Sequence, residues 1–336
     1  MQNTLQDNPR QLWEYVRERG KRSRIPGSML YNDKSINTPS EIADAFADFF
    51  KSVYQCPSNS DAYPVEQDCI TIMSISENEV IAAGKALPVS NAIGCDEVPS
   101  FIVKDCIYLW AKPICQILNE SLKQDIFPER WKSALIVPIH KAGKVNEINN
   151  YRPIAILSPF AKIYEKILYR RIFHMVKNRI STSQHGFYSG RSTVTNLIDL
   201  TQTVAEGLDN NLQTEVIYTD FRKAFDTVNH NILLAKLAEI GLSKKLLNLF
   251  KSYLSGRKQY VFYKGTQSSI FIPTSGVPQG SCLSTLLFAI FINDLTKILG
   301  SGVLLFADDV KLIRHIQSAT DILLLQNQLN KFSEWL

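Results

Sequence analysis

Three aspartates in the chain have the type and spacing for metal-dependent phosphate chemistry. Asp308 and Asp309 stand side by side within 302–313, where apolar residues of strand-forming type flank them and predict a β-hairpin with an acidic tip. Asp220 ends a second apolar strand candidate, 215–220. Adjacent carboxylates repel each other and are stable mainly beside a cation, and Mg²⁺ prefers such hard oxygen ligands. These residues therefore predict a site for divalent metal.

The pairing of the two strands decides what that site can do. If they lie side by side, Asp220 and Asp308 can hold two metals about 4 Å apart, one activating an attacking hydroxyl and one steadying a leaving pyrophosphate. This is phosphoryl or nucleotidyl transfer chemistry. Taken alone, Asp308 and Asp309 could equally form a solvated hairpin tip.

The distribution of charge favours a polyanionic substrate. The net charge is +5, but 141–179 holds nine Lys or Arg and two Glu, which is +7 and leaves −2 for the rest of the chain. Neutralising phosphates releases counterions and drives binding without sequence preference. The alternative is a solvated helix face.

Two groups of cations lie within this basic segment. Strand candidates 133–139 and 151–154 present Lys141 and Arg152, which together would clamp a triphosphate, unless they are only exposed surface cations. A helix expected over 159–176 buries one apolar face. Another of its faces carries cations at four-residue spacing that could track a phosphate backbone: Lys162, Lys166 and Arg170.

A glycine-rich turn forms a third feature. Gly276-Val277-Pro278-Gln279-Gly280 precedes an apolar helix expected over 283–299, which lets backbone approach a ligand closely at the helix N-terminus. A hairpin is expected at 259–263 and 269–273, around Gly265. Further helices are expected at 9–19, 38–53, 76–86, 98–124 with a break near Pro113, 192–208, 229–240, 243–254 and 319–336.

Length and composition limit the class of protein. With 336 residues, 45% of them hydrophobic, the chain should form one large domain or two subdomains. The polar stretch 56–68 contains two prolines and suggests a boundary. The six cysteines of the whole chain form no metal-binding pair, which favours a reducing, intracellular compartment. No apolar run approaches the roughly 18 residues of a membrane span, so we expect no membrane partner.

Together these pieces resemble the reverse transcriptase domain of non-LTR (LINE-type) retrotransposons, and most of all insect elements of the jockey group. The resemblance covers the chain from about Pro9 to its end. The matching pieces, in family order, are 131–141, 150–154, 184–187 (Gln-His-Gly-Phe), 220–226, 276–280 and 306–309 (Phe-Ala-Asp-Asp).

The resemblance implies an α+β fold: a right-hand polymerase palm, which is an antiparallel sheet with packed helices, together with fingers. It implies a helical N-terminal extension at 1–68 and fingers and palm at 69–336, with the thumb missing. The implied catalytic acids are Asp220, Asp308 and Asp309. The implied ligands of two Mg²⁺ ions, for which Mn²⁺ could substitute, are Asp220, Phe221 and Asp308.

The resemblance also implies which residues hold the nucleotide. They are Lys141, Arg152, Phe221, Phe225, Gln279 and Gly280. Phe225 matches a bulky residue that lies under the sugar and rejects a ribose 2′-hydroxyl, and Gln279 matches a glutamine that contacts the nucleotide near its 3′-hydroxyl. Where the family usually has Gly-Pro after the glycine-rich turn, this chain has Ser284-Thr285.

The implied function is RNA-directed DNA synthesis by two-metal nucleotidyl transfer, with an RNA template, a DNA primer and dNTPs as partners. The element's life cycle implies a nuclear and cytoplasmic location. Because the chain ends before the expected thumb, we expect weak activity from it. Two alternatives stay open: an intron-maturase-like or RNA-copying polymerase, and a degenerate or domesticated copy that binds RNA without catalysis. The sequence does not set the oligomeric state.

Overall fold

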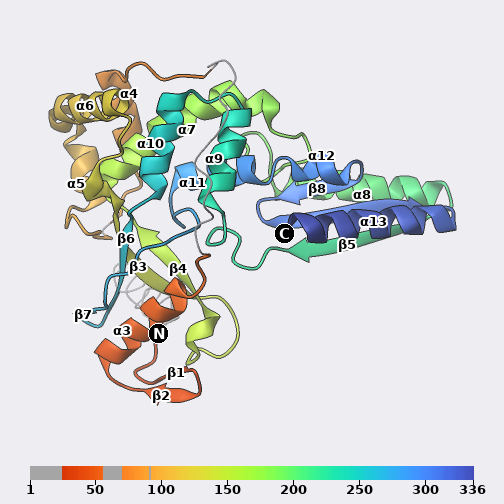
Figure 1. The fold of residues 1–336 in the computed structure, drawn as a ribbon, viewed down its shortest axis with the longest axis horizontal. Coiled ribbons are helices and arrows are strands. Elements are labelled where there is room, and N and C mark those ends of the chain that lie inside the picture. The colour runs from red at the N-terminus through yellow and green to blue at the C-terminus, as the bar shows by residue number, and fades with distance from the viewer. Residues whose placement is uncertain (1–24, 56–69, 91) are drawn as a thin grey trace, which may run out of the picture. The chain divides into compact units, whose positions relative to one another are not determined.

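The computed structural model describes residues 25–55, 70–90 and 92–336 (Figure 1). The chain forms two compact units. Unit 1 comprises residues up to Ser52, Ile136–Ile154 and Tyr260–Phe271; unit 2 comprises Val53–Leu135, Ala155–Gln259 and Ile272–Leu336. The helix expected at 9–19 and the connector at 56–68 lie outside the described residues, so the boundary between 1–68 and 69–336 stays a prediction.

Unit 1 combines a short hairpin, one helix and most of a small sheet. The antiparallel hairpin is β1 (Met29–Tyr31) and β2 (Lys34–Ile36). Helix α3 (Pro39–Lys51) begins at Thr38, whose side chain forms a reciprocal capping box with Glu41. The sheet, with strand order β4-β3-β6-β7, consists of β3 (Ser133–His140), β4 (Tyr151–Ile156), β6 (Lys258–Tyr263) and β7 (Thr266–Gln267). Phe46 of α3 packs edge-on against Tyr151, with ring centroids 5.1 Å apart.

The expected hairpin around Gly265 exists, but its second strand is Thr266–Gln267 and not 269–273. Lys264 and Gly265 both have positive φ (45° and 83°), which closes a two-residue turn and pairs Tyr263 directly with Thr266. The strand then ends because Ser269 donates its backbone N–H and hydroxyl to Asp44 of α3, at 2.8 and 3.0 Å. Side-chain contacts therefore override the strand propensity of 269–273.

Helices form most of unit 2. They are α4 (Glu77–Lys85), α5 (Ser100–Asp105), α6 (Ile107–Gln124), α7 (Pro159–Val176), α9 (His230–Glu239), α10 (Lys244–Leu254), α11 (Cys282–Phe291) and α12 (Leu295–Leu299). Short 3₁₀ turns occur at Glu129–Lys132, Ile148–Asn150 and Lys177–Arg179, the second of these in unit 1. The aromatic centre of unit 2 stacks Phe127 on Tyr164 (5.4 Å) and sets Tyr253 edge-on to Phe127 (5.0 Å).

The break expected near Pro113 occurs at Cys106 instead. Cys106 leaves helical geometry (φ −96°, ψ 16°) between α5 and α6, whereas Pro113 lies inside α6. A proline removes one helical hydrogen bond and frees the carbonyl four residues earlier, here that of Leu109. Both residues are on the exposed face of α6, where water can satisfy that carbonyl. The helix therefore continues through the proline.

The second sheet is flanked by helices on both faces. Its strands, all antiparallel and in the order β5-β9-β8, are β5 (Gln213–Asp220), β8 (Val303–Phe306) and β9 (Asp309–Ile316). Figure 1 shows this sheet with α8 (Thr193–Asp209) and α13 (Ala319–Trp335). Lys311 of β9 contacts Asn196 of α8, and Arg314 contacts Gln328 of α13. Since side chains alternate along a strand, odd and even positions of β9 face different helices.

The helix expected at 283–299 is interrupted at 292–294, which separates α11 from α12. In contrast to the expectation from sequence, 282–299 is long and apolar enough to cross a membrane by length and composition alone. Within the chain, however, 56% of that window is buried. This burial is typical of a core helix in a folded domain.

Candidate active site

The β8–β9 hairpin carries the acidic tip, and β5 lies beside it. Register pairs Asp220 directly with Asp309, while Asp308 lies in the two-residue turn between Phe306 and Asp309. Directly opposed residues of antiparallel strands share one face, with Cβ atoms about 4.5–5.5 Å apart. The expectation that the two acidic strand ends lie side by side is confirmed, and the direct partner of Asp220 is Asp309.

The three carboxylates influence one another electrostatically. Asp220 and Asp309 are exposed and Asp308 is half-buried. The pKa of Asp309 is raised by partial burial, then by the charges of Asp308 and Asp220, while Lys311 opposes the rise. Three negative charges thus converge at one end of a sheet, where a cation would relieve their repulsion.

The donor chemistry of this end suits a hard divalent cation. Carboxylate oxygens are the ligands that Mg²⁺ and Mn²⁺ accept. Across residues 25–55, 70–90 and 92–336, however, no three His, Cys, Asp or Glu side chains converge closely enough to form a ready metal cage. The residues fit a cation that is also held by substrate oxygens rather than one enclosed by protein alone.

The turn between the strands is strained and is supported from outside the hairpin. Ala307 has φ 56°, a region that a tight hairpin turn requires and that glycine usually fills. Its backbone N–H donates to the side-chain oxygen of Gln184 at 3.3 Å, and the same oxygen accepts from Gly186 N–H at 2.8 Å. Gln184 is only 1% exposed. A buried amide therefore satisfies the backbone of the turn that holds Asp308.

The segment 183–186 pairs with β8 as an added extended piece. His185 N–H donates to Leu305 O (2.8 Å), and Leu305 N–H donates to Ser183 O (2.9 Å). A Cβ atom placed on Gly186 would lie 2.1 Å from the backbone nitrogen of Ala307. Only glycine permits this approach, so Gly186 packs directly against the turn that holds Asp308.

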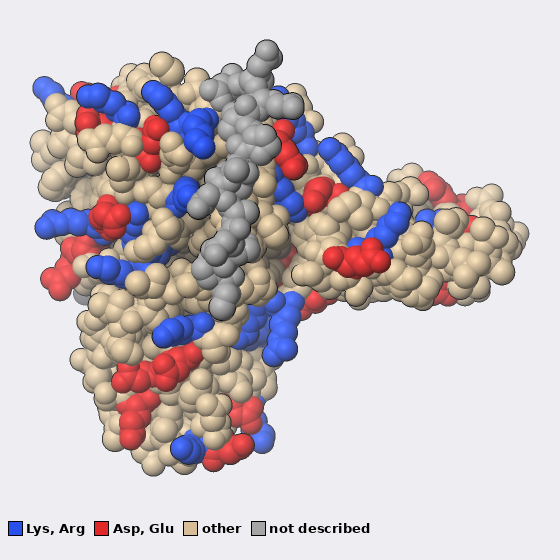
Figure 2. Space-filling view, viewed as in Figure 1, with Lys and Arg blue, Asp and Glu red and all other residues tan. Residues whose placement is uncertain are grey.

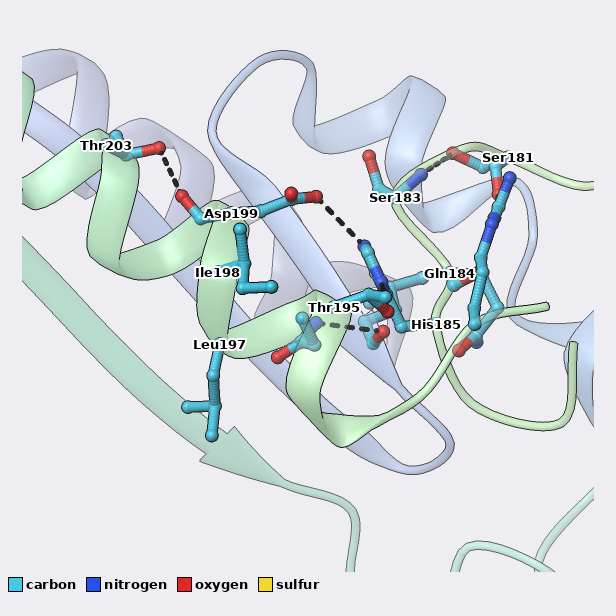
Figure 3. Close-up of polar contacts among 12 residues, drawn as sticks. Ser181, Ser183, Gln184, His185, Thr195, Leu197, Ile198, Asp199 and Thr203 are labelled. Atoms are coloured by element: carbon cyan, nitrogen blue, oxygen red, sulfur yellow. Dashed lines mark hydrogen bonds and ion pairs between the residues drawn. The ribbon is translucent and has the colours of Figure 1, made fainter.

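His185 anchors that segment to α8, as Figure 3 shows. Its Nδ1 lies 2.9 Å from the Thr195 hydroxyl, and its Nε2 lies 3.2 Å from an Asp199 carboxylate oxygen. Burial lowers the pKa of His185. Hydrolases also align a hydroxyl, an imidazole and a carboxylate, but here the Thr195 hydroxyl donates to Ser192 O (2.9 Å) within the capping box of α8. The three groups therefore have a structural role, which is to attach the segment 183–186 to α8.

A second region joins the loop after β5 to the glycine-rich turn. Val277 N–H donates to Phe225 O, and Gly276 N–H donates to Val228 O, both at 2.8 Å. The Ser275 hydroxyl donates to Asp226 O at 2.7 Å. Gly276 has φ 83°, and a Cβ atom there would lie 2.7 Å from Asp226 O. These contacts fix the two segments to each other.

Gln279 meets a buried acid within this region. Its Nε2 lies 2.9 Å from each carboxylate oxygen of Asp226, which is 6% exposed. Burial raises the pKa of Asp226 to about 6, although Gln279 and Lys223 both pull it down. The backbone of Gln279 is held as well, because Ala155 N–H donates to its carbonyl oxygen at 2.8 Å. Next to it, the exposed Gly280 has φ 113°.

Two aromatic side chains follow Asp220. The ring of Phe225 stacks on Phe288 (centroids 4.8 Å apart) and meets Phe187 edge-on (6.0 Å). The ring of Phe221 packs among α13 aromatics, 5.6 Å from Phe332 and 5.8 Å from Trp335. Phe225 therefore joins the segment that carries Gln184 to the loop that carries Asp226.

The predicted cations fall in both units. Lys141 and Arg152 are exposed in unit 1, where Lys141 N–H donates to Asn150 O (2.8 Å) and so joins the ends of β3 and β4. Of the α7 cations in unit 2, Arg170 is exposed and Lys162 is half-buried. Lys166 donates to Ala86 O (3.0 Å). On the face shown in Figure 2, basic side chains are interspersed with acidic ones.

Three residues with clear structural roles had no role in the prediction from sequence: Gln184, Gly186 and Asp226. All three belong to segments that matched the family pattern. Asp226 had a usable signal, because it is an acid that follows an apolar pair, Ala224-Phe225, and such an acid needs a partner when buried. The contact of Gly186 with Ala307 joins positions far apart in the chain, which no local pattern reveals.

Comparison with known proteins shows which family this chain resembles. Residues 139–336 match the family model described as reverse transcriptase (RNA-dependent DNA polymerase). A protein named "Probable RNA-directed DNA polymerase from transposon BS", from Drosophila melanogaster, is 31% identical over 245 residues, which is 72% of this chain and 27% of the relative. The RNA-directed DNA polymerase from mobile element jockey of the same species is 29% identical over 283 residues, 80% of this chain and 31% of the relative.

Among solved structures, an apo telomerase from Candida tropicalis, truncated from its C-terminal domain, aligns with TM-score 0.44 and 16% identity. The alignment covers 62% of this chain and 49% of the telomerase. The chain spans between a quarter and a third of the length of the curated relatives described above. Because the family model covers more than half of its residues, including both acidic strand ends, the chain belongs to the reverse transcriptase (RNA-dependent DNA polymerase) family.

Proposed function

We propose that this chain carries out RNA-directed DNA synthesis, joining a dNTP to the 3′-hydroxyl of a DNA primer on an RNA template. The observation that carries the proposal is the register of β5 with β9, which sets Asp220 opposite Asp309 and beside the turn that holds Asp308. Membership of the family supports it. The names of its relatives, which are polymerases of mobile elements, point to the same chemistry.

Reverse transcriptases generally use divalent metal ions. In this proposal Asp220 and Asp308 would hold two Mg²⁺ ions, or Mn²⁺. Phe221 has no polar side-chain atom, so it would contribute its main-chain carbonyl oxygen. When bound, the metals lower the pKa of the attacking hydroxyl and stabilise the leaving pyrophosphate. Asp309 adds negative charge beside these ligands, and Gln184 and Gly186 keep the turn in place.

The remaining predicted residues take roles in binding. We assign the sheet β5-β9-β8 with α8 and α13 to the palm of a right-hand polymerase, and the sheet that precedes Lys141 and contains Arg152 to the fingers. These two cations would bind the triphosphate through charge-assisted hydrogen bonds. Phe225 and Gln279 would contact the sugar, with Gly280 beside them. Lys162, Lys166 and Arg170 would lie along the nucleic acid backbone.

Single-nucleotide incorporation tests the proposal most directly, because a single addition does not require the protein to stay bound to the template-primer duplex. The purified chain is mixed with an RNA template, a labelled DNA primer, one complementary dNTP and Mg²⁺. We expect extension by one nucleotide that EDTA abolishes, with dNTP strongly preferred over rNTP. Preference for rNTP would indicate an RNA-copying enzyme. RNA binding without any incorporation, with Mg²⁺ and with Mn²⁺, would contradict the proposal and indicate a binding-only copy.

A further inference from the structure

The hydrogen bond between Gln279 and Asp226 has a direction that the surrounding structure imposes. An ionised carboxylate only accepts hydrogen bonds, and a side-chain amide has one donating end and one accepting end. Both oxygens of Asp226 lie 2.9 Å from Nε2 of Gln279. Reversing the amide would place Oε1 against two buried carboxylate oxygens and remove their donor. Burial makes that arrangement costly, so Nε2 points to Asp226 and Oε1 is left out of the contact.

Neither partner can move away to relax this constraint. Asp226 is held at its backbone oxygen by Ser275, and its N–H donates to Lys223 O (2.8 Å). Gln279 is held at its own carbonyl by Ala155 N–H. On its other side, a Cβ atom placed on Gly280 would lie 2.8 Å from Ala155 O, so the chain fits closely there too. The orientation of the amide is therefore preset before any ligand arrives.

We propose that Asp226 is a positioning residue for nucleotide selection, which fixes the Gln279 amide so that Oε1 accepts a hydrogen bond from the sugar of the incoming nucleotide. This inference rests on the proposed function, which puts that nucleotide at Gln279. An accepting oxygen selects for a hydroxyl, since a hydroxyl can donate and a C–H cannot do so comparably. The only sugar hydroxyl of a dNTP is at the 3′ position. The site should therefore prefer dNTP over the 2′,3′-dideoxy analogue.

The selectivity ratio tests this inference. Single-nucleotide incorporation is measured with a dNTP and with its dideoxy analogue, and kcat/KM for the first is divided by that for the second. In Asp226→Asn the neighbouring amide can present either end, so the Gln279 amide loses its imposed direction. We expect the ratio to fall about tenfold, the equivalent of one hydrogen bond, with the change mainly in KM for dNTP.

Two further measurements separate positioning from a structural role. In Gln279→Leu the ratio should fall by a similar factor, and adding Asp226→Asn to it should change the ratio no further, because Asp226 acts through Gln279. Asp294→Asn is the matched control, since Asp294 is another acid of unit 2 that binds side-chain donors, Lys236 and Trp335. That control should leave the ratio unchanged.

The outcomes are distinguishable. Equal losses for dNTP and dideoxy analogue in Asp226→Asn, or an effect that persists in the Gln279→Leu background, would overturn the inference while leaving the proposed function intact. Gln279→Leu gives an independent answer should Asp226→Asn fail to fold, because an unchanged ratio there also overturns it. A wild-type chain that incorporates nothing refutes the proposed function, and this inference with it.

Discussion

Unit 2 holds two groups of acids in opposite ways. Asp220, Asp308 and Asp309 converge at an open sheet end, where they repel one another. Asp226 is buried, and its carboxylate is matched by the amide of Gln279. In the first group Lys311 offsets only part of the repulsion, since the pKa of Asp309 stays raised, whereas the carboxylate of the second group has a hydrogen-bond donor. The acids proposed to meet a charged ligand thus repel one another, and the acid proposed to orient Gln279 is satisfied within the fold.

The difference also has a thermodynamic side. Asp220 and Asp309 are exposed and Asp308 is half-buried, so water screens the repulsion among them and their effect on folding is small. Burying Asp226 favours its neutral form, and the raised pKa records that cost. Function should therefore depend most on the exposed acids, and stability most on the buried one.

The largest expected effect on activity comes from substitutions among Asp220, Asp308 and Asp309. Asp308→Asn or Asp220→Asn removes the charge of a proposed metal ligand, which should lower kcat for single-nucleotide incorporation by about a thousandfold or more. RNA binding and thermal stability should be unchanged, because relief of repulsion offsets any lost contact. Glu215→Gln, on the same strand as Asp220, is the control. Activity of both variants within tenfold of wild type would refute the assignment.

A second change displaces the turn while leaving its charges intact. The methyl group of Gly186→Ala would collide with the backbone of Ala307. We expect a loss of about 1–3 kcal/mol in the free energy of unfolding. A shift of the turn by about 1 Å should lower kcat about a hundredfold.

Gly94→Ala is the matched control for that change. The nearest atom to its added Cβ would be the Ile156 carbonyl oxygen at 3.4 Å, and Gly94 has no positive φ. Urea unfolding and incorporation rates are measured on both variants. If Gly186→Ala behaves like Gly94→Ala, the turn does not depend on this close packing.

Substitution of Phe225, which precedes Asp226, tests whether the volume of its ring excludes the 2′-hydroxyl of a ribonucleotide. Phe225→Val removes ring volume where Phe225 stacks on Phe288. The efficiency of rNTP relative to dNTP should rise about tenfold or more, because the opened space admits a 2′-hydroxyl. Phe173→Val, which shortens another half-buried ring that contacts Tyr188, should lower stability without moving that ratio. If the efficiency of rNTP relative to dNTP is unchanged in Phe225→Val, Phe225 contributes to packing and not to sugar selection.

The smallest effect concerns stability and pH. Because the native pKa of Asp226 is about 6 and the ordinary value is 3.8, the native state binds more protons than the unfolded state between these values. This group's contribution to the free energy of unfolding therefore falls as pH rises from about 4 to 6 and stays low above that. Its charged and titratable neighbours are Lys223 and Tyr54, and Tyr54 stays neutral because its pKa is raised.

Asp226→Asn removes this titration. As pH rises from 4.5 to 7.5, the free energy of unfolding of the variant should therefore increase by about 1–3 kcal/mol relative to that of the wild type. Urea unfolding at both pH values measures the difference, and Asp294→Asn serves again as the control. Parallel pH dependence in wild type and Asp226→Asn would mean that the buried carboxylate does not titrate as described.

Local patterns in the sequence were sufficient for most elements. The helices expected to begin near Thr38, Ser76 and Ser192 do begin there, and each is capped by that residue. Apolar residues of strand-forming type on both sides of Asp308 and Asp309 predicted the hairpin, which a two-residue turn closes. These signals lie within a few residues of the structure they specify, so they can be read without knowledge of the fold.

Contacts between distant segments could not be predicted in the same way. Ser269 leaves its strand because of Asp44, and Pro113 is tolerated because its face of α6 meets solvent. The pairing of Asp220 with Asp309 follows from a register that the family pattern implies only in outline. The orientation of Gln279 depends on which atom of Asp226 faces it, and no spacing rule contains that information.

The two-residue turn of the β8–β9 hairpin has a consequence for how such chains can diverge. Side chains around the turn can change one at a time, but the number of residues in the turn cannot change without disturbing the strands. One residue inserted between Phe306 and Asp309 would shift β9 against β5 or force a bulge, and a one-residue slip turns every β9 side chain to the opposite helix. Insertions and deletions in related chains should therefore gather outside 303–316, and that stretch should keep a constant length even where its sequence has drifted.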